Sequence, residues 1–282
     1  MNISSNTQPI HGNYRGYYTK RPFVHDPRLT LLPTSIFKDA RVLDVGCNEG
    51  WVTCEIAQSW GARRVIGVDI DDTLVRAAWK RRRTVWSQQE PATHEATPAD
   101  DHPSKGKKRK KCSEECHEFP RIPRPEYFPA SCEHMFSPLP IPAARSPEDA
   151  HTFPHNVMFY TADWVNHDIP EDANQYDVVV AFSISKWIHL NGGDEGLRCF
   201  FHRVHSVLLP GGKFVLEPQE WETYAKARRM DAKLKENAKS LQLRPEDFER
   251  VLSEIGFGPA QHVGITGEGG FRRPVDIYVK TG

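Results

Sequence analysis

The chain has 282 residues, equal numbers of basic and acidic side chains (37 Lys+Arg, 37 Asp+Glu) and 38% hydrophobic residues. This length suits one elaborated domain or two small ones, and the balanced charge gives no overall indication of a nucleic-acid partner. Six cysteines in a chain this long do not indicate a disulfide framework. No apolar run is long enough for a membrane span, and the N-terminus lacks a signal-peptide core, so we expect a soluble intracellular protein without membrane contact.

The N-terminal segment mixes aromatic and basic side chains. Residues 1–10 are expected to form a disordered tail, and residues 11–28 (HGNYRGYYTKRPFVHDPR) interleave tyrosines with arginines and lysines. Such a mixture can stack on bases and pair with phosphates. It can equally form an arm whose tyrosines pack on the main domain, and the sequence leaves both interpretations open.

The stretch VLDVGCNEG, residues 42–50, predicts a strand, a tight turn and the start of a helix. Its small residues let backbone N–H groups approach a ligand closely. The spacing of Gly46, Asn48 and Gly50 does not meet the dinucleotide pattern GxGxxG, although Asn adopts the left-handed conformation at low cost. An acid two residues before the first glycine, here Asp44, is typical of enzymes that use S-adenosylmethionine (SAM). The alternative is an ordinary strand-to-helix turn that binds nothing.

A second strand is predicted over residues 64–69. It ends at Asp69, about 20 residues beyond the turn, where an acid can accept hydrogen bonds from ribose hydroxyls. Asp72 is the expected N-cap of a helix that runs to about residue 86. From about 87 to 154 prolines recur and apolar periodicity vanishes, which predicts a long disordered insertion into a single domain of residues 11–282.

The insertion contains a dense basic run, KGKKRKK, at residues 105–111. Such a run is typical of a nuclear import signal or a nonspecific nucleic-acid contact, and its plainer interpretation is a solvated loop. We take it to favour the nucleus. The nearby Cys112, Cys116, Cys132 and His134 have a spacing that fits no common zinc finger, so we predict no metal site.

The second half of the chain continues to alternate strands with helices. The strands are expected at 156–161, 176–183, 213–216, 257–263 and 274–279, and the helices at about 193–208, 222–240 and 245–255. This order predicts an α/β fold with a seven-stranded, mostly parallel sheet, helices on both faces and a terminal antiparallel hairpin. That is the plan of the class I (Rossmann-like) SAM-dependent methyltransferases.

Polar side chains follow the predicted strands at the edge where open sheets bind ligands. Asp163 follows the third strand and can accept a hydrogen bond from an adenine amino group, or it can cap a turn. The fourth strand leads into SISKWIHLN, so Lys186 and His189 are candidates for substrate contact from a loop. A motif FRRP before the last strand sets two arginines beside an aromatic residue. It indicates an anion site or, alternatively, an exposed strand end.

Several motifs together resemble one family. The sequence contains GNY-x-x-YY near its start, then VLDVGCNEG, VIGVDID, DVVVAFSISKWIHLN, GDEGL, LLPGGKFVLEPQEW and GFRRPV. This set is similar to the bicoid-interacting-protein family of RNA methyltransferases, over most of the chain except the insertion. SKW-hydrophobic-HLN with LEPQ-x-W is far more specific than the glycine turn. The resemblance implies methyl transfer from SAM to the 5′ γ-phosphate of a small noncoding RNA, with S-adenosylhomocysteine (SAH) as product.

The resemblance also implies roles for individual residues. Those expected to bind the cofactor are Tyr18, Arg28, Gly46, Cys47, Asn48, Asp69, Ile70, Ala162, Asp163 and Phe182. Those expected to hold the RNA 5′ end are Tyr17, Arg21, Lys186, Gln219, Phe271, Arg272 and Arg273, with His189 as a further substrate contact. Partners in a ribonucleoprotein, such as La-related proteins, are implied by the same resemblance.

A terminal phosphate needs positioning rather than activation. Its second pKa is about 6, so it is largely a dianion near neutral pH and needs no general base. An oxygen must lie ~3–3.5 Å from the methyl carbon and in line with the sulfur. Lys186, Arg21 and the Tyr17 hydroxyl suit this task, so we predict that they are the catalytic residues. The fold alone is also compatible with methylation of a 5′-monophosphate, a protein or a small molecule. A third alternative is a chaperone that mainly retains RNA.

Overall fold

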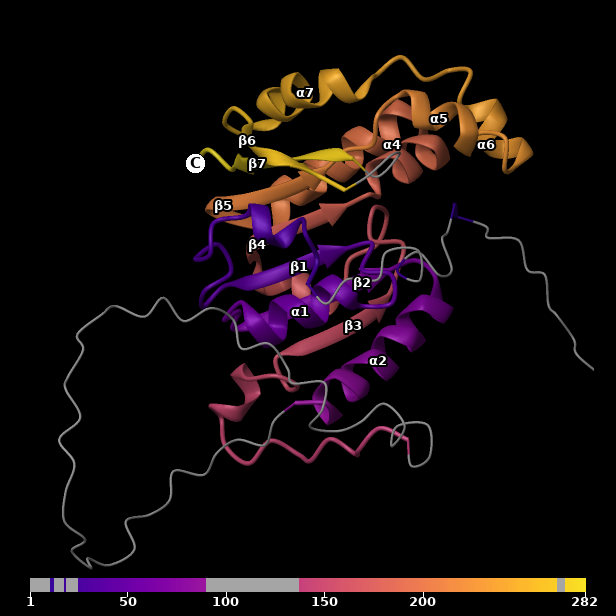
Figure 1. The fold of residues 1–282 in the computed structure, drawn as a ribbon. Helices are drawn as coiled ribbons and strands as arrows, with labels where there is room; N and C mark the ends of the chain where they lie inside the picture. Colours follow the sequence, from indigo (N-terminus) through magenta and orange to yellow (C-terminus); the bar gives the residue numbers. More distant parts are fainter. Residues whose placement is uncertain (1–10, 13–17, 19–24, 90–136, 268–271) are drawn as a thin grey trace, which may run out of the picture.

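The computed structural model describes residues 11–12, 18, 25–89, 137–267 and 272–282, and its sheet is seen in Figure 1. Seven strands are ordered β3-β2-β1-β4-β5-β7-β6. Their bounds are β1 Arg41–Val45, β2 Arg64–Asp69, β3 Val157–Thr161, β4 Tyr176–Phe182, β5 Leu208–Glu217, β6 Gln261–Thr266 and β7 Arg273–Val279. β1 to β5 pair in parallel, and β7 is antiparallel to both β5 and β6. The predicted mostly parallel sheet with a terminal antiparallel pair is confirmed.

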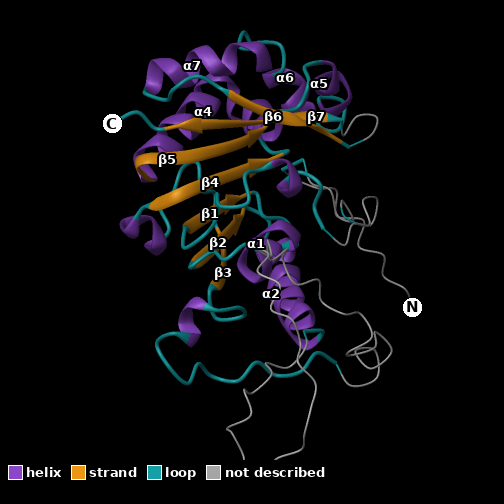
Figure 2. Cartoon of the chain, turned by 60° about the vertical axis from the view of Figure 1, so that its left-hand side comes forward, coloured by secondary structure: helices purple, strands orange, loops and turns teal. Residues whose placement is uncertain are grey.

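Helices cover both faces of this sheet (Figure 2). On one face lie α1 (Trp51–Ser59) and α2 (Asp72–Ser87); on the other lie α4 (Ser185–Val207) and α7 (Phe248–Ile255), with α5 (Glu222–Ala227) and α6 (Ala232–Asn237) next to α4. Successive strand residues point to opposite faces. Val42 therefore packs in the core that contains Ile56 of α1, whereas Leu43 packs in the core that contains Phe200 of α4.

Helix α4 begins eight residues earlier than the sequence indicated, at Ser185 instead of about 193. The backbone departs from helical geometry at Gly193, where φ is 69° and ψ is −171°. This break interrupts the helical spacing of apolar residues, so the sequence pattern did not indicate the turns before it. Lys186 and His189 consequently lie on a helix, and our placement of them in a loop is wrong. A helix fixes the direction of both side chains more tightly than a loop would.

Other elements differ in their bounds. The N-cap of α2 is Asp71, not Asp72, because the Asp71 carboxylate accepts a hydrogen bond from the Thr73 N–H at 2.8 Å. Strand β5 begins at Leu208 and runs through the Pro-Gly-Gly segment. The single helix expected over 222–240 is two short helices, since Asp231 adopts an extended backbone and caps α6. A 3-10 turn, Pro245–Asp247, precedes α7, and β6 lies a few residues later than predicted.

The expected insertion is attached to the domain at its C-terminal end. Ser87 Oγ accepts a hydrogen bond from the Leu139 N–H at 2.7 Å, and Arg82 Nε donates to the Pro154 carbonyl at 2.9 Å. Residues 137–154 therefore differ from our expectation of disorder throughout 87–154. The basic run, the cysteines of residues 112–132 and the tail 1–10 lie outside the described residues.

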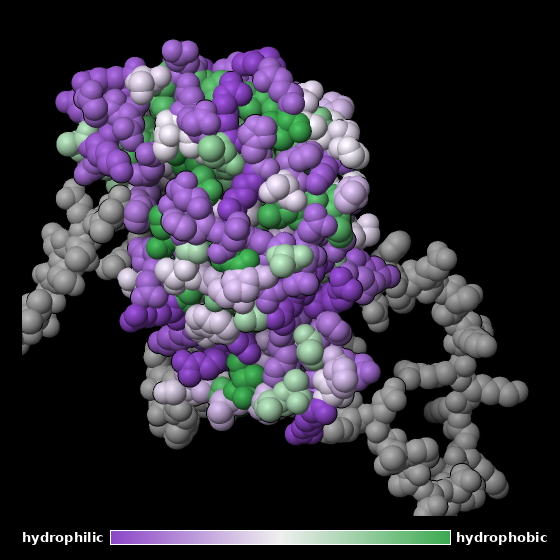
Figure 3. All heavy atoms as spheres, turned by 180° about the vertical axis from the view of Figure 1, so that it is seen from behind, coloured by the Kyte–Doolittle hydropathy of each residue, from purple (hydrophilic) through white to green (hydrophobic). Residues whose placement is uncertain are grey.

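The helices and one face of the surface can be compared with what a membrane-spanning segment requires. Among the described residues, no helix is both long and apolar enough to cross a bilayer. Hydrophilic side chains cover most of the face in Figure 3, and apolar residues show there in small separate groups.

Candidate active site

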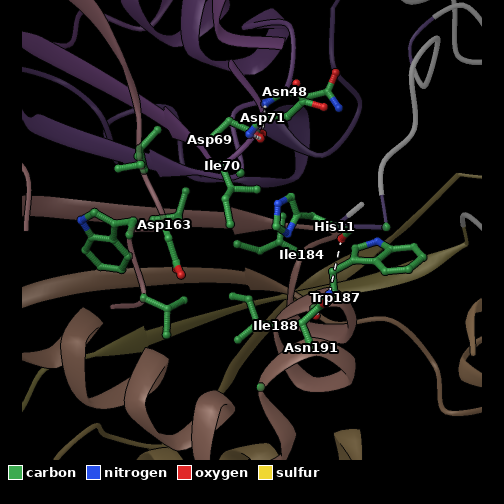
Figure 4. Close-up of a pocket in the computed structure, with 18 of the residues that line it drawn as sticks. His11, Asn48, Asp69, Ile70, Asp71, Asp163, Ile184, Trp187, Ile188 and Asn191 are labelled. Atoms are coloured by element: carbon green, nitrogen blue, oxygen red, sulfur yellow. Dashed lines mark hydrogen bonds between the residues drawn. The ribbon is translucent and has the colours of Figure 1, made fainter. Parts of the chain in front are cut away.

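A cavity of about 570 Å³ opens where the carboxyl ends of β1, β2 and β4 meet the first turns of α4 (Figure 4). Asn48 and Asp69 lie on one side of it, Ile188 and Asn191 of α4 lie opposite, and Asp163 lies between the two. Open α/β sheets bind ligands at this edge. The predicted location of the site therefore coincides with a cavity.

The turn after β1 and the end of β2 are locked together. Asp69 accepts hydrogen bonds from the backbone N–H of Asn48 at 2.9 Å and of Asp71 at 3.0 Å. Burial raises the pKa of Asp69, while these two N–H donors oppose the rise. Each carboxylate oxygen can accept more than one hydrogen bond. Asp69 is thus fixed at the cavity wall with acceptor capacity left for a ligand.

Asp44 lies deeper, below the same turn. It is 3% exposed and accepts a hydrogen bond from Thr53 Oγ1 at 2.6 Å. Burial raises the pKa of Asp44 to about 7. It is not among the residues that line the cavity, so its contact with α1 supports the turn from beneath.

Gly46 brings the turn against the segment that precedes α4. Its φ is 76°, and a Cβ there would lie 2.2 Å from Ile184 Cγ2. Gly46→Ala is therefore expected to lower the free energy of unfolding by about 1–2 kcal/mol for backbone strain and by about 1–3 kcal/mol more for overpacking. Because Ile184 also lines the cavity, affinity for SAH should fall as well. Chemical denaturation and calorimetric SAH titration measure both.

Gly211→Ala is the matched control, since Gly211 has the same φ of 76° but nothing within 4 Å of its would-be Cβ. It should show the backbone strain alone and leave SAH affinity unchanged. Equal losses of stability in the two variants, with equal SAH affinity, would show that the contact of Gly46 with Ile184 is unimportant.

The N-terminal arm packs on the domain wherever the structure describes it. The Asn191 side-chain amide donates to the His11 carbonyl at 3.5 Å, and Gly12 contacts the Trp187 indole. Tyr18 is 7% exposed and stacks on Trp51 with ring centroids 5.2 Å apart. These contacts place the start of the arm across one wall of the cavity.

Arg28 enters the cavity wall from the arm and is 1% exposed. Its guanidinium donates to both oxygens of Asp26, at 2.8 and 2.6 Å, and to Glu217 Oε2 at 3.0 Å. Burial alone would lower the pKa of Arg28, but the charges of Glu217 and Asp26 raise it above its usual value. The guanidinium also lies over the Phe182 ring, 4.6 Å from its centroid. Arg28 is therefore a fixed cation that joins the arm to the end of β5.

The turn between β4 and α4 is held from the end of β5 and the start of β7. Ser183 Oγ donates to Glu217 Oε2 at 2.5 Å and accepts from Arg273 Nη1 at 2.7 Å. Gln219 Oε1 accepts from the Lys186 N–H and from Ser185 Oγ, both at 3.0 Å, and Gln219 Nε2 donates to the Ser183 carbonyl. Gln219 thus positions this turn through three hydrogen bonds, and its predicted contact with RNA stays a prediction.

Lys186 lies beside the cavity, because Ser183, Ile184 and Trp187 around it in the chain line the wall. It is 5% exposed, and its Nζ donates to Thr223 Oγ1 at 3.1 Å. Burial, together with the charges of Arg273 and Lys226, lowers the pKa of Lys186 to about 8. The fold thereby brings two predicted RNA-binding cations, Lys186 and Arg273, to one edge of the cavity.

His189 is not available to a substrate. Its ring is fully buried; Nε2 lies 2.7 Å from Asp194 Oδ1 and Nδ1 lies 3.2 Å from the Tyr224 hydroxyl. Burial lowers its pKa, against the effect of Asp194. The burial of this ring contradicts the predicted substrate contact of His189: Nδ1 connects α4 to Tyr224 of α5, and Nε2 binds Asp194 further along α4 itself. Asp194 also accepts from the Gln242 and Leu243 N–H groups, so the cluster fixes the helix that carries Lys186.

Most of the predicted cofactor residues line the cavity. They are Tyr18, Arg28, Gly46, Asn48, Asp69, Ile70, Ala162, Asp163 and Phe182. Cys47 does not line it: its side chain is 2% exposed and packs in the core under the turn, so only its backbone is left for the predicted cofactor contact. Arg272 is exposed next to Arg273. Tyr17, Arg21 and Phe271 lie outside the described residues, so their roles stay predictions.

Other lining residues were missed. Trp187, Ile188 and Asn191 come from the first turns of α4, and Ser183 and Ile184 from the turn before it. Reading SISKWIHLN as a helix would have placed Ile184, Trp187, Ile188 and Asn191 on one face by their spacing. Glu217 was also missed, although it ends a buried strand beside the predicted Gln219.

The residues of this cavity fit SAM. Asp69 offers carboxylate oxygens of the kind that ribose hydroxyls need, and Asp163 offers an acceptor for an amino group. Phe182 and Ile70 supply apolar surface. The contacts described above use three of the five N–H donors of the Arg28 guanidinium, which leaves donors for a carboxylate. Among the described residues there is no group of three or more His, Cys, Asp or Glu side chains that could hold a metal ion.

Known proteins share this fold. Magnesium protoporphyrin IX methyltransferase of Synechocystis, solved with bound SAM, superposes with a TM-score of 0.51 at 12% identity, covering 97% of this chain and 89% of that one. A methyltransferase-domain model matches residues 42–104, which include the glycine turn and Asp69. The chain thus has the class I SAM-dependent methyltransferase fold, and SAM is the cofactor that these matches imply.

Sequence relatives extend over nearly the whole chain. The 7SK snRNA methylphosphate capping enzyme of Mus musculus is 36% identical over 96% of this chain, which spans 40% of that protein's length. A probable RNA methyltransferase of Arabidopsis thaliana is 31% identical over 95% of this chain and 80% of its own length. The family model named Bicoid-interacting protein 3 (Bin3) matches residues 176–280. This chain belongs to the Bin3 family of methyltransferases.

Proposed function

We propose that this chain is an RNA 5′-γ-phosphate methyltransferase, which transfers a methyl group from SAM to the terminal phosphate of a small noncoding RNA. The observation that carries the proposal is the pair of cations, Lys186 and Arg273, at the edge of a cavity that fits SAM. The name of the mouse relative, a methylphosphate capping enzyme, points to the same reaction.

The chain's own residues position the reactants. SAM, when bound at this cavity, would supply an electrophilic methyl group for transfer to a phosphate oxygen, with SAH as the leaving product. Lys186 and Arg273 hold the other phosphate oxygens, so that one oxygen is left free to attack. Gln219 accepts a hydrogen bond from the backbone N–H of Lys186, and Ser183 accepts one from the Arg273 guanidinium; these two bonds hold the cations relative to the cavity wall. No proton transfer is needed, because the terminal phosphate is already a dianion above its second pKa of about 6.

The test is methyl transfer from labelled SAM to one short RNA made with a 5′ triphosphate, monophosphate or hydroxyl. Label on the triphosphate RNA alone, released with its γ-phosphate, is expected. Label on the monophosphate RNA would replace the proposal by monophosphate methylation. Absence of label on all three, with SAM bound, would contradict the proposed reaction and favour RNA retention. Labelled RNA that stays on the protein after transfer would show that the enzyme also retains its product.

The pH dependence follows from Lys186. Its pKa lies at about 8, lowered by burial and by Arg273 and Lys226. Only the protonated amine attracts a phosphate, so kcat/KM for RNA, which reports the free enzyme, should fall as pH rises through about 8. Lys186→Arg keeps its positive charge at all these pH values. The variant should therefore show no fall of kcat/KM at alkaline pH, although its maximal kcat/KM should be lower than that of the wild type. A wild-type profile that stays level to pH 10 would show that the charge of Lys186 is not needed.

We further propose that the protein acts in the nucleus and associates with ribonucleoprotein components such as La-related proteins. The basic run at residues 105–111 supports nuclear import, and the mouse relative is named for a small nuclear RNA. Replacing the run with glutamines in a fluorescent fusion should move the protein out of the nucleus. If the fusion protein stays in the nucleus without the basic run, the run is not its nuclear import signal.

A further inference from the structure

One exposed lysine next to the proposed phosphate site has no role in the reaction described above. Lys226 lies on α5, which follows β5 and packs beside α4. Among the described residues its side chain makes no hydrogen bond or ion pair, including with Glu222 one turn earlier on the same helix. We propose that Lys226 forms a second phosphate subsite, which binds the α- and β-phosphates of a 5′-triphosphate RNA while Lys186 and Arg273 hold the γ-phosphate. This inference rests on the proposed function.

Helix α5 is fixed to α4 by two adjacent residues. Thr223 accepts the hydrogen bond from Lys186 Nζ at 3.1 Å, and the Tyr224 hydroxyl lies 3.2 Å from His189 Nδ1. Tyr224 is 2% exposed and belongs to a small core that also contains Leu190 and Leu234. Thr223 in turn donates to the Glu220 carbonyl at 2.7 Å. The face of α5 that bears Thr223 is thereby held against Lys186.

Lys226 shares that face. Residues three apart on a helix are neighbours, with Cβ atoms about 5–6 Å apart. Since Thr223 contacts Lys186 directly, Lys226 lies one helical turn further from the same amine. A third cation, Arg273, reaches this place from β7 and is 6% exposed. Three separate elements therefore bring positive charges together.

The cations affect one another. The charges of Arg273 and Lys226 contribute to the lowered pKa of Lys186, after burial. Bringing like charges together costs free energy unless an anion compensates them. Lys186 and Arg273 are buried and fixed, whereas Lys226 is exposed and has a long, flexible stem. This difference suits a fixed site for the reacting phosphate and an adaptable contact for the phosphates behind it.

The arrangement distinguishes RNA 5′ ends by their charge. A terminal phosphate carries up to about two negative charges near pH 7, and each bridging phosphate of a triphosphate adds one more. A monophosphate end can be satisfied by Lys186 and Arg273, whereas a triphosphate extends further and needs a cation outside that pair. Lys226 would therefore set the preference for triphosphate ends over monophosphate ends.

The test compares binding of one fluorescent RNA with a 5′ triphosphate or a 5′ monophosphate, with SAH present, at one fixed salt concentration. The wild type is expected to bind the triphosphate about tenfold more tightly. Lys226→Gln should lose most of this ratio by weakening triphosphate binding, with monophosphate binding unchanged. Lys235→Gln is the matched control, because Lys235 is exposed on the neighbouring α6, and it should keep the wild-type ratio.

Two outcomes overturn the subsite: a wild type that binds both RNA ends equally, or a Lys226→Gln variant that keeps the full ratio. Turnover separates this inference from the proposed function. If the wild type methylates triphosphate RNA, Lys226→Gln should raise KM with little change in kcat. If the wild type transfers no methyl group to the γ-phosphate but its binding ratio depends on Lys226, the reaction is wrong and the subsite stands.

Discussion

Lys186→Ala is expected to reduce kcat/KM for methyl transfer to 5′-triphosphate RNA by at least about 100-fold, which is typical for loss of a buried charged group that acts in the transition state. Lys186 is held by its neighbours, since Gln219 binds its N–H and Thr223 its amine. Its stem is buried, so the amine is held in an ordered position on the side of α4 that contacts α5. Removing it leaves the phosphate without its best-positioned cation.

SAH affinity separates a local effect of this variant from a general one. Lys186 is not among the residues that line the cavity, so SAH should bind to Lys186→Ala within about twofold of the wild type. Thermal stability should not fall greatly either, because the substitution removes a buried charge that Arg273 and Lys226 already disfavour. Lys235→Ala is the control for loss of a positive charge. Wild-type turnover in Lys186→Ala would remove this lysine from the site.

The cofactor side of the site could be predicted from sequence because its signals are local. A glycine turn after a strand and an acid at the end of the next strand are separated by short, regular elements. Gly46 and Asp69 therefore lie where the motif puts them, at the wall of one cavity. The same short range explains why a mostly parallel sheet could be inferred, since strands that alternate with helices permit few arrangements.

The substrate side depends on contacts that no local pattern reveals. His189 and Lys186 stand three residues apart in one motif, yet Tyr224 and Asp194 bury the first, while Thr223 leaves the second beside the cavity. Gln219 looks like a substrate ligand in sequence but binds the turn that carries Lys186. The distinction required knowing where α5 packs, and its two-helix form was itself not predicted because Asp231 interrupts it.

The second large effect is expected for Arg28→Met. Arg28 is the cation between two buried carboxylates, Asp26 and Glu217, whose side chains are 4% and 0% exposed. Removing one partner of a buried ion pair leaves an uncompensated charge and costs about 3–5 kcal/mol. Unfolding of Arg28→Met should therefore occur at a much lower denaturant concentration. Arg63→Met is the control, because Arg63 is exposed and makes no ion pair with any described residue.

A second substitution identifies the cause. Adding Glu217→Gln removes one of the two buried negative charges that Arg28 compensates, and should recover part of the stability lost in Arg28→Met. No recovery in the double variant would mean that the loss does not come from the buried charge of Glu217.

SAH binding then tests the role of Arg28 in the cavity. Arg28 lines the wall, and its remaining N–H donors suit the carboxylate of the methionine end. The double variant Arg28→Met/Glu217→Gln, although more stable than Arg28→Met, should still bind SAH at least about tenfold more weakly than the wild type, because the lost charge-assisted hydrogen bonds are not restored. Recovery of SAH affinity together with stability would instead mean that Arg28 acts only by holding the arm on β5.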